Sequence, residues 1–142
     1  MRPSNASSRP RILIVDDNRS VVDMLSDTVI SLGYDAEIAL GGRSALASFA
    51  ARRPDAVLLD IRMPGMDGPE VLAEIRRIDR DVPVLIVTAT WDQTTARALL
   101  RSGAFDLLHK PVDREYLALA LAAALGGDAA ALTAASAARL RP

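Results

Sequence analysis

The chain has 142 residues, of which 50% are hydrophobic and 25% charged, as expected of one globular domain with a sizeable core. Its formal net charge of -1 gives no electrostatic reason to expect binding to nucleic acid or an anionic membrane, and no apolar run approaches the roughly 18 residues that span a bilayer. The absence of cysteine excludes disulfides, thiolate metal sites and thiol nucleophiles, and is compatible with the cytoplasmic location that we expect.

The composition divides the chain into three parts. Residues 1–10 are polar and include Pro3 and Pro10, which predicts a flexible N-terminal arm. Residues 11–126 carry alternating apolar and polar segments and form the expected domain. Residues 127–142 are rich in alanine, which favours helix, although short isolated helices are marginal in water. A capped helical extension, a disordered tail and a linker to further sequence therefore all stay open.

Five short segments are predicted strands, at 12–15, 35–39, 56–59, 84–87 and 105–109. The first, third and fourth are continuous apolar runs, which suit central strands of a parallel sheet that is covered on both faces. The second and fifth mix polar and apolar residues, which suits the edges of the sheet.

Apolar residues at spacings of three and four predict five helices between and after these strands, around 22–32, 46–50, 71–78, 96–100 and 117–125. Gly33 and Gly103 end the first and fourth helices, and Asp113 is the expected N-cap of the fifth. Strands that alternate with helices give an open α/β sheet with helices on both faces. Ligands of such sheets bind beyond the carboxyl ends of the strands.

Polar side chains follow four of these strands at that edge: Asp16-Asp17, Asp60, Thr88 and Lys110. Two carboxylates about 5 Å apart repel by roughly 3 kcal/mol at an effective dielectric of 20, so the acidic cluster needs a cation. Oxygen ligands on loops suit Mg²⁺, with Mn²⁺ as the alternative, and Lys110 adds a charge for a phosphoryl oxygen. Asp60 is the natural nucleophile, because a carboxylate can attack phosphorus to give an aspartyl phosphate.

Four stretches resemble the receiver domains of response regulators in bacterial two-component signalling: ILIVDD at 12–17, LLDIRMPGMDG at 58–68, VTA at 87–89 and HKP at 109–111. The resemblance covers roughly residues 11–125. It implies a flavodoxin-like, doubly wound α/β fold with five parallel strands in the order 2-1-3-4-5.

The resemblance also implies the roles of the site residues. Asp60 would be the phosphoacceptor, and Asp17 and Asp60 would ligate magnesium directly. Asp16 would act mainly through water, and the backbone carbonyl of Arg62 would supply a further ligand.

Activation and partners are implied in the same way. Lys110 would contact the phosphoryl group, Thr88 would move toward it, and the bond from Lys110 to Pro111 would be cis. The phosphodonor would be a histidine kinase or a histidine phosphotransfer protein. A downstream effector would read the phosphorylated state, and a homodimer through the fourth helix, fifth strand and fifth helix is a further expectation.

One position departs from the receiver pattern. Many receivers carry Tyr or Phe three residues before the lysine, where this chain has Leu107, so the aromatic half of the switch is missing. We expect Phe105 to fill the core and His109 to face the protein from its strand. Trp91 is expected at the start of the fourth helix, where it either marks a partner surface or packs against the fold.

The leading hypothesis is a stand-alone receiver that catalyses only its own phosphorylation and dephosphorylation and signals through partner binding. One alternative is a receiver fragment whose output domain is missing, and another is a pseudo-receiver that is never phosphorylated. An aspartate-nucleophile phosphatase is disfavoured, because such enzymes place their nucleophile in an Asp-x-Asp pattern after the first strand. Here adjacent aspartates, Asp16 and Asp17, follow that strand.

Overall fold

The computed structural model describes residues 9–89 and 92–126. The predictions for Trp91, for the first eight residues of the arm and for the alanine-rich segment 127–142 lie outside this range. Within it, no helix is long and apolar enough to cross a membrane.

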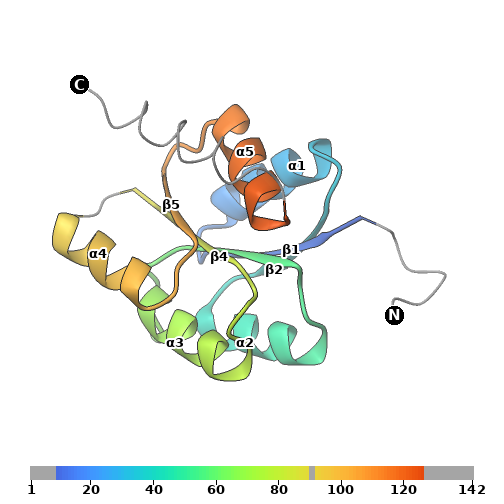
Figure 1. Ribbon diagram of the computed structural model, residues 1–142. Helices are drawn as coiled ribbons and strands as arrows, with labels where there is room; N and C mark the ends of the chain where they lie inside the picture. The colour runs from blue at the N-terminus through green and yellow to red at the C-terminus, as the bar shows by residue number, and fades with distance from the viewer. Residues whose placement is uncertain (1–8, 90–91, 127–142) are drawn as a thin grey trace.

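Five parallel strands form a single sheet in the order β2-β1-β3-β4-β5 (Figure 1), which confirms the predicted fold and strand order. The strands are β1 (Arg11–Val15), β2 (Asp35–Ala39), β3 (Ala56–Leu59), β4 (Val84–Thr88) and β5 (Asp106–His109). The two strands with mixed polarity, β2 and β5, lie at the edges as predicted. Thr88 is the last residue of β4 rather than part of the following loop, and β5 begins one residue later than expected.

Helices cover both faces of the sheet, with α1 and α5 on one face and α2, α3 and α4 on the other (Figure 1). They are α1 (Arg19–Ser31), α2 (Gly42–Ala51), α3 (Gly68–Ile78), α4 (Gln93–Arg101) and α5 (Arg114–Ala124). Asp113 caps α5 as predicted, and its carboxylate accepts from the N–H of Tyr116 at 3.1 Å. Gly33 and Gly103 follow the ends of α1 and α4 with φ angles of 97° and 105°, which glycine adopts without strain.

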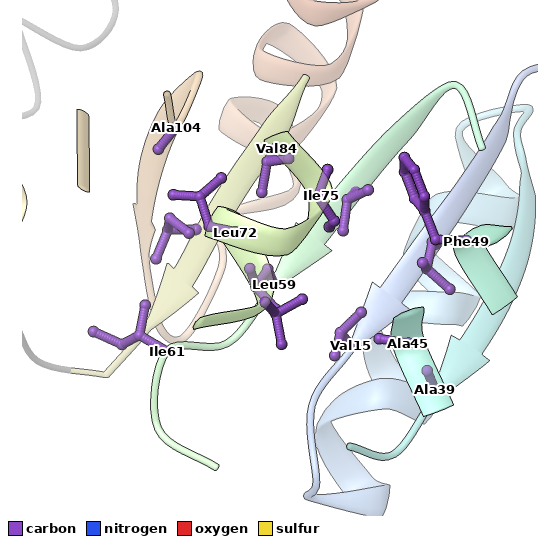
Figure 2. Close-up of a cluster of buried hydrophobic side chains, with 14 of the residues drawn as sticks. Val15, Ala39, Ala45, Phe49, Leu59, Ile61, Leu72, Ile75, Val84 and Ala104 are labelled. Carbon is purple, nitrogen blue, oxygen red and sulfur yellow. The ribbon is translucent and has the colours of Figure 1, made fainter. Parts of the chain in front are cut away.

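The central strands carry continuous apolar runs, with Arg11 at the start of β1 and Thr88 at the end of β4, because alternate residues enter two separate cores. In β1, Leu13 and Val15 pack toward α2 and α3 (Figure 2), whereas Ile12 and Ile14 pack toward α1 and α5. All four side chains are at most 1% exposed. Since burying one such side chain contributes roughly 1.5–3 kcal/mol, the double-sided pattern fixes the register and the faces of the sheet.

Two predictions at the edge strand are wrong. Phe105 was expected in the core, but it precedes β5 and is 37% exposed. His109 was expected to face the protein, but it is exposed at the end of β5. Both errors have one cause: among the described residues β5 pairs with β4 alone, so the ends of β5 are less covered than those of a central strand. Leu108, in the middle of this edge, is buried.

Candidate functional site

The sheet topology brings two of the predicted acids together. Asp16 and Asp60 directly follow β1 and β3, which are neighbours with Val15 opposite Leu59. The N–H of Asp60 donates to the carbonyl of Val15 at 2.9 Å, so a backbone hydrogen bond joins the carboxyl-terminal ends of β3 and β1. Asp16 and Asp60 are only 2% and 6% exposed.

Asp17 completes an acidic cluster at this edge. Carboxylate oxygens of Asp16, Asp17 and Asp60 all lie within 4.8 Å of one another, and Asp17 is the exposed member. Three hard oxygen ligands within reach of one ion are a donor set that fits Mg²⁺ or Mn²⁺.

Lys110 reaches the same cluster from the end of β5. Its Nζ donates to Asp16 Oδ2 at 2.7 Å and to Asp60 Oδ1 at 3.4 Å. The backbone N–H of Lys110 donates to the carbonyl of Thr88 at 2.8 Å, and the peptide bond from Lys110 to Pro111 is cis, as the resemblance implied. Lys110 is also the only lysine in the sequence, where the other 16 of the 17 lysine and arginine side chains are arginine. The flexible ammonium group of a lysine thus occurs only beside the cluster of three carboxylates.

The charge balance of the cluster shifts two pKa values. Burial, reinforced by the negative charge of Asp16, raises the pKa of Asp60 above its ordinary value, although Lys110 and the backbone N–H of Arg62 oppose the shift. Burial alone would lower the pKa of Lys110, but the hydrogen bond to Asp16 and the charges of both acids outweigh it, so that this pKa is raised. Lys110 is therefore stabilised in its protonated form, whereas burial and the charge of Asp16 disfavour the ionised form of Asp60.

Asn18 is a site residue that sequence reasoning missed. Its side chain caps α1 by accepting from the N–H groups of Ser20 and Val21 at 3.0 and 3.3 Å. Its own N–H donates to Asp16 Oδ1 at 3.0 Å, while Asp16 Oδ2 accepts from Lys110. The acidic pair is thus not the cap of α1. An Asn between the acidic pair and a helical pattern is an N-cap signal that could have revealed this.

The remaining predicted residues come from the ends of β3, β4 and β5. Thr88, at the end of β4 beside β3, is 1% exposed and stands opposite His109 in the strand register. Arg62 is exposed two residues after Asp60, and its N–H approaches the Asp60 carboxylate. The assignment of its carbonyl as a metal ligand stays a prediction. Leu107 is half-buried against the core that faces α2, α3 and α4.

Comparisons with known proteins agree with this geometry. The family model described as the response regulator receiver domain matches residues 12–122. The regulatory protein AtoC of Escherichia coli is 46% identical over 115 residues, which cover 81% of this chain and 25% of AtoC. The response regulator MprA of Mycolicibacterium vanbaalenii is 40% identical over 131 residues, which cover 87% of this chain and 57% of MprA. The chain thus spans about a quarter to just over half of the length of these relatives.

Solved structures show the same similarity in three dimensions. The chemotaxis protein CheY4 of Vibrio cholerae is 32% identical and matches with a TM-score of 0.79, over 83% of this chain and 100% of that chain. A putative response regulator from Chloroflexus aurantiacus is 31% identical, with the same TM-score of 0.79 over 83% of this chain and 98% of that chain.

Proposed function

This chain belongs to the family of response regulator receiver domains, and we propose that it accepts a phosphoryl group on Asp60 in a magnesium-dependent reaction. The observation that carries the proposal is the buried edge at which Lys110 bonds both Asp16 and Asp60 while Asp17 adds a third carboxylate. The domain that performs this function would be residues 11–126, between a short arm at 1–10 and a tail or linker at 127–142.

In the proposed reaction, a carboxylate oxygen of Asp60 attacks the phosphorus of a phosphohistidine on a kinase or phosphotransfer protein. An oxygen–phosphorus bond forms as the nitrogen–phosphorus bond breaks, and the imidazole nitrogen keeps the electron pair. Lys110 Nζ, already 3.4 Å from Asp60 Oδ1, would turn to a phosphoryl oxygen and offset its charge.

Asp17, Asp60 and the carbonyl of Arg62 would hold Mg²⁺, which, when bound, would neutralise charge on the transferring group. Asp16 would contact the ion mainly through water, since both of its carboxylate oxygens already accept hydrogen bonds within the fold. A bound cation would oppose the rise in the pKa of Asp60 that burial and the charge of Asp16 cause.

Signalling would follow as a population shift. Contacts from Thr88 and Lys110 to the aspartyl phosphate would favour an active arrangement that a downstream effector recognises. A shift from 1:99 to 99:1 needs about 5.5 kcal/mol, which two charge-assisted hydrogen bonds of roughly 1.5–3 kcal/mol reach only at their upper end. Partner binding, including a homodimer through α4, β5 and α5, would then complete activation. Because Leu107 replaces the aromatic residue, Thr88 would act without that partner in the switch.

The proposal is tested by intact-mass analysis after incubation with acetyl phosphate and Mg²⁺. The wild type should gain one phosphoryl group, about 80 Da for an aspartyl adduct, and the gain should disappear without Mg²⁺ and in Asp60→Asn. Asp27→Asn, an exposed acid on α1, is the matched control and should be modified like the wild type. If no adduct forms, a beryllofluoride titration followed by the fluorescence of Trp91 separates rapid hydrolysis from an inert site. No response in either experiment would favour the pseudo-receiver.

A further inference from the structure

The segment after Asp60 connects β3 to α3 and is held at both ends. Ile61 and Met63 are each 7% exposed and belong to the core, and Asp67 forms a capping box with Glu70 at the start of α3. Between these anchors, Pro64 and Gly65 are exposed. The position of residues 64–66 is therefore determined by the neighbouring residues that pack against them.

Gly42, the first residue of α2, is in direct contact with this segment. A β-carbon placed on Gly42 would lie 2.8 Å from both the β-carbon and the carbonyl oxygen of Met66, and 2.9 Å from its γ-carbon. These separations are shorter than the contacts that real β-carbons make. The helix can thus approach Met66 this closely only because residue 42 has no side chain.

The requirement for glycine at this position is one of space and not of backbone conformation. The positive-φ glycines of the described residues are Gly33, Gly65, Gly103 and Gly126, so Gly42 adopts a backbone conformation that other residues tolerate. Its neighbour Gly41 provides the contrast, because a β-carbon there would meet nothing within 4 Å.

We propose that Gly42 is a positioning residue for phosphoryl transfer, which seats the segment 61–67 beside Asp60 through its contact with Met66. The inference rests on the function proposed for Asp60. The link to the site is the backbone of Arg62, whose N–H lies close enough to the Asp60 carboxylate to oppose the rise in its pKa and whose carbonyl is the proposed metal ligand.

A side chain at residue 42 would displace the segment and not the helix. α2 is fixed in the core by Ala45 and Phe49, both 0% exposed, so it cannot withdraw without opening a cavity. The segment can yield more easily, because it contains exposed Pro64 and Gly65. A displacement of Met66 would therefore be transmitted toward Arg62, and the backbone groups that serve Asp60 would lose their alignment.

The test compares Gly42→Ala with Gly41→Ala in the full chain. Gly42→Ala should increase amide hydrogen exchange across residues 61–67 in the metal-free protein. It should also weaken Mg²⁺ binding about tenfold, the scale seen when groups that orient metal ligands are altered, and slow phosphorylation by acetyl phosphate. Gly41→Ala should match the wild type in all three measurements.

Phe49→Leu separates positioning from a general loss of stability. Phe49 is wholly buried in α2 but is not among the atoms that approach Gly42, so its truncation should lower the melting temperature without weakening Mg²⁺ binding by the folded protein. Wild-type exchange and Mg²⁺ affinity in Gly42→Ala would overturn the proposal, as would an equal loss of affinity in Phe49→Leu.

Met66→Gly tests the same contact from the other side and serves if Gly42→Ala fails to fold. Alone it removes the β- and γ-carbons that bear on Gly42 and should weaken Mg²⁺ binding a few-fold; unchanged affinity would count against the contact. Combined with Gly42→Ala it should restore part of the lost affinity, since two of the three close contacts are relieved.

A wild type that takes up neither Mg²⁺ nor phosphoryl groups would refute the proposed function. The hydrogen-exchange comparison of Gly42→Ala with Gly41→Ala would still decide whether Gly42 positions the segment 61–67.

Discussion

The amino-terminal and carboxyl-terminal ends of the sheet strands each hold a cation among carboxylates, but the cation is buried at the first end and half-buried at the second, and the balance of charge differs. At the amino-terminal edge, Arg11 is 8% exposed and pairs with Glu37 through its guanidinium, which also donates to the carbonyl of Arg52. The backbone N–H of Arg11 donates to Asp55 Oδ2 at 2.7 Å. At the carboxyl-terminal edge, Lys110 faces Asp16 and Asp60, with Asp17 nearby.

The difference shows that burial alone does not mark a functional charge. The arginine joins β1 to β2, to the end of α2 and to the start of β3, through Glu37, the carbonyl of Arg52 and Asp55. The lysine bonds two carboxylates, and an oxygen of the third, Asp17, lies within 4.8 Å of theirs, so one cation faces three acids and the excess negative charge can attract a cationic ligand. We therefore expect Arg11 to act on stability and Lys110 on both stability and ligand binding.

Arg11→Met should have the largest effect on stability. It leaves the buried side of Glu37 and the carbonyl of Arg52 without this donor. Because the Glu37 side chain is 35% exposed and partly screened by water, we expect a cost of about 2–3 kcal/mol. Urea unfolding would measure the loss, whereas the folded fraction should keep wild-type Mg²⁺ affinity. Arg52→Gln is the control, because the side chain of Arg52 is exposed and only its carbonyl takes part. A cost below about 1 kcal/mol would show that the pair behaves like a surface ion pair.

Lys110→Met should destabilise the metal-free protein by about 2 kcal/mol. It removes the donor to Asp16 and Asp60 and leaves their repulsion without the ammonium charge between them. Saturating Mg²⁺ should recover most of this loss but none of the loss in Arg11→Met, which distinguishes the two edges. Because Lys110 is the only lysine, a sample labelled with ¹⁵N-lysine gives a direct signal for its ammonium group. That signal should move when Mg²⁺ binds the wild type, and a static signal would place the ion elsewhere.

Asp60→Asn should stabilise the metal-free protein at neutral pH, by about 1 kcal/mol or roughly 4 °C in melting temperature. Burial and the charge of Asp16 raise the folded-state pKa of Asp60 above its unfolded value, so the folded state binds more protons between the two pKa values. Wild-type stability therefore gains as pH falls through the folded pKa, and ionised Asp60 lowers stability above it.

The advantage of Asp60→Asn should accordingly shrink toward acidic pH and in saturating Mg²⁺. Asp55→Asn at the opposite edge is the matched comparison and should not stabilise, because the Asp55 carboxylate accepts from the N–H of Arg11. Melting temperatures of both variants and the wild type would be measured from about pH 4, near the ordinary pKa of a carboxyl group, to about pH 8. A destabilised Asp60→Asn protein at neutral pH would contradict the charge argument.

The sequence predicted the carboxyl-terminal edge better than the amino-terminal one, for a physical reason. Apolar strands that end at Asp16 and Asp60 must converge when they are neighbours in a parallel sheet, so local pattern and topology were sufficient. Arg11 looked like a polar boundary before an apolar run, and its acceptor Asp55 lies 44 residues away. Such a network depends on side-chain geometry that no periodicity encodes.

The same limit explains the other errors. Phe105 and His109 were placed by strand alternation, which does not report that an edge strand lacks a neighbour on one side. Gly42 drew no prediction from the sequence, because its contact with Met66 exists only once α2 and the segment after β3 are packed together.

Asp17→Asn should have the smallest effect on stability and a clear effect on the ligand. Asp17 is exposed, so losing its charge should change the free energy of unfolding by no more than about 0.5 kcal/mol. As a proposed direct ligand, it should nevertheless weaken Mg²⁺ binding at least about tenfold, measured by calorimetric titration. The control Asp27→Asn changes an exposed acid outside the cluster and should leave affinity unchanged. Unchanged Mg²⁺ affinity in Asp17→Asn would show that this carboxylate is not a metal ligand. A large loss of stability would instead make the carboxyl-terminal edge resemble the amino-terminal one, where the charges hold the fold together.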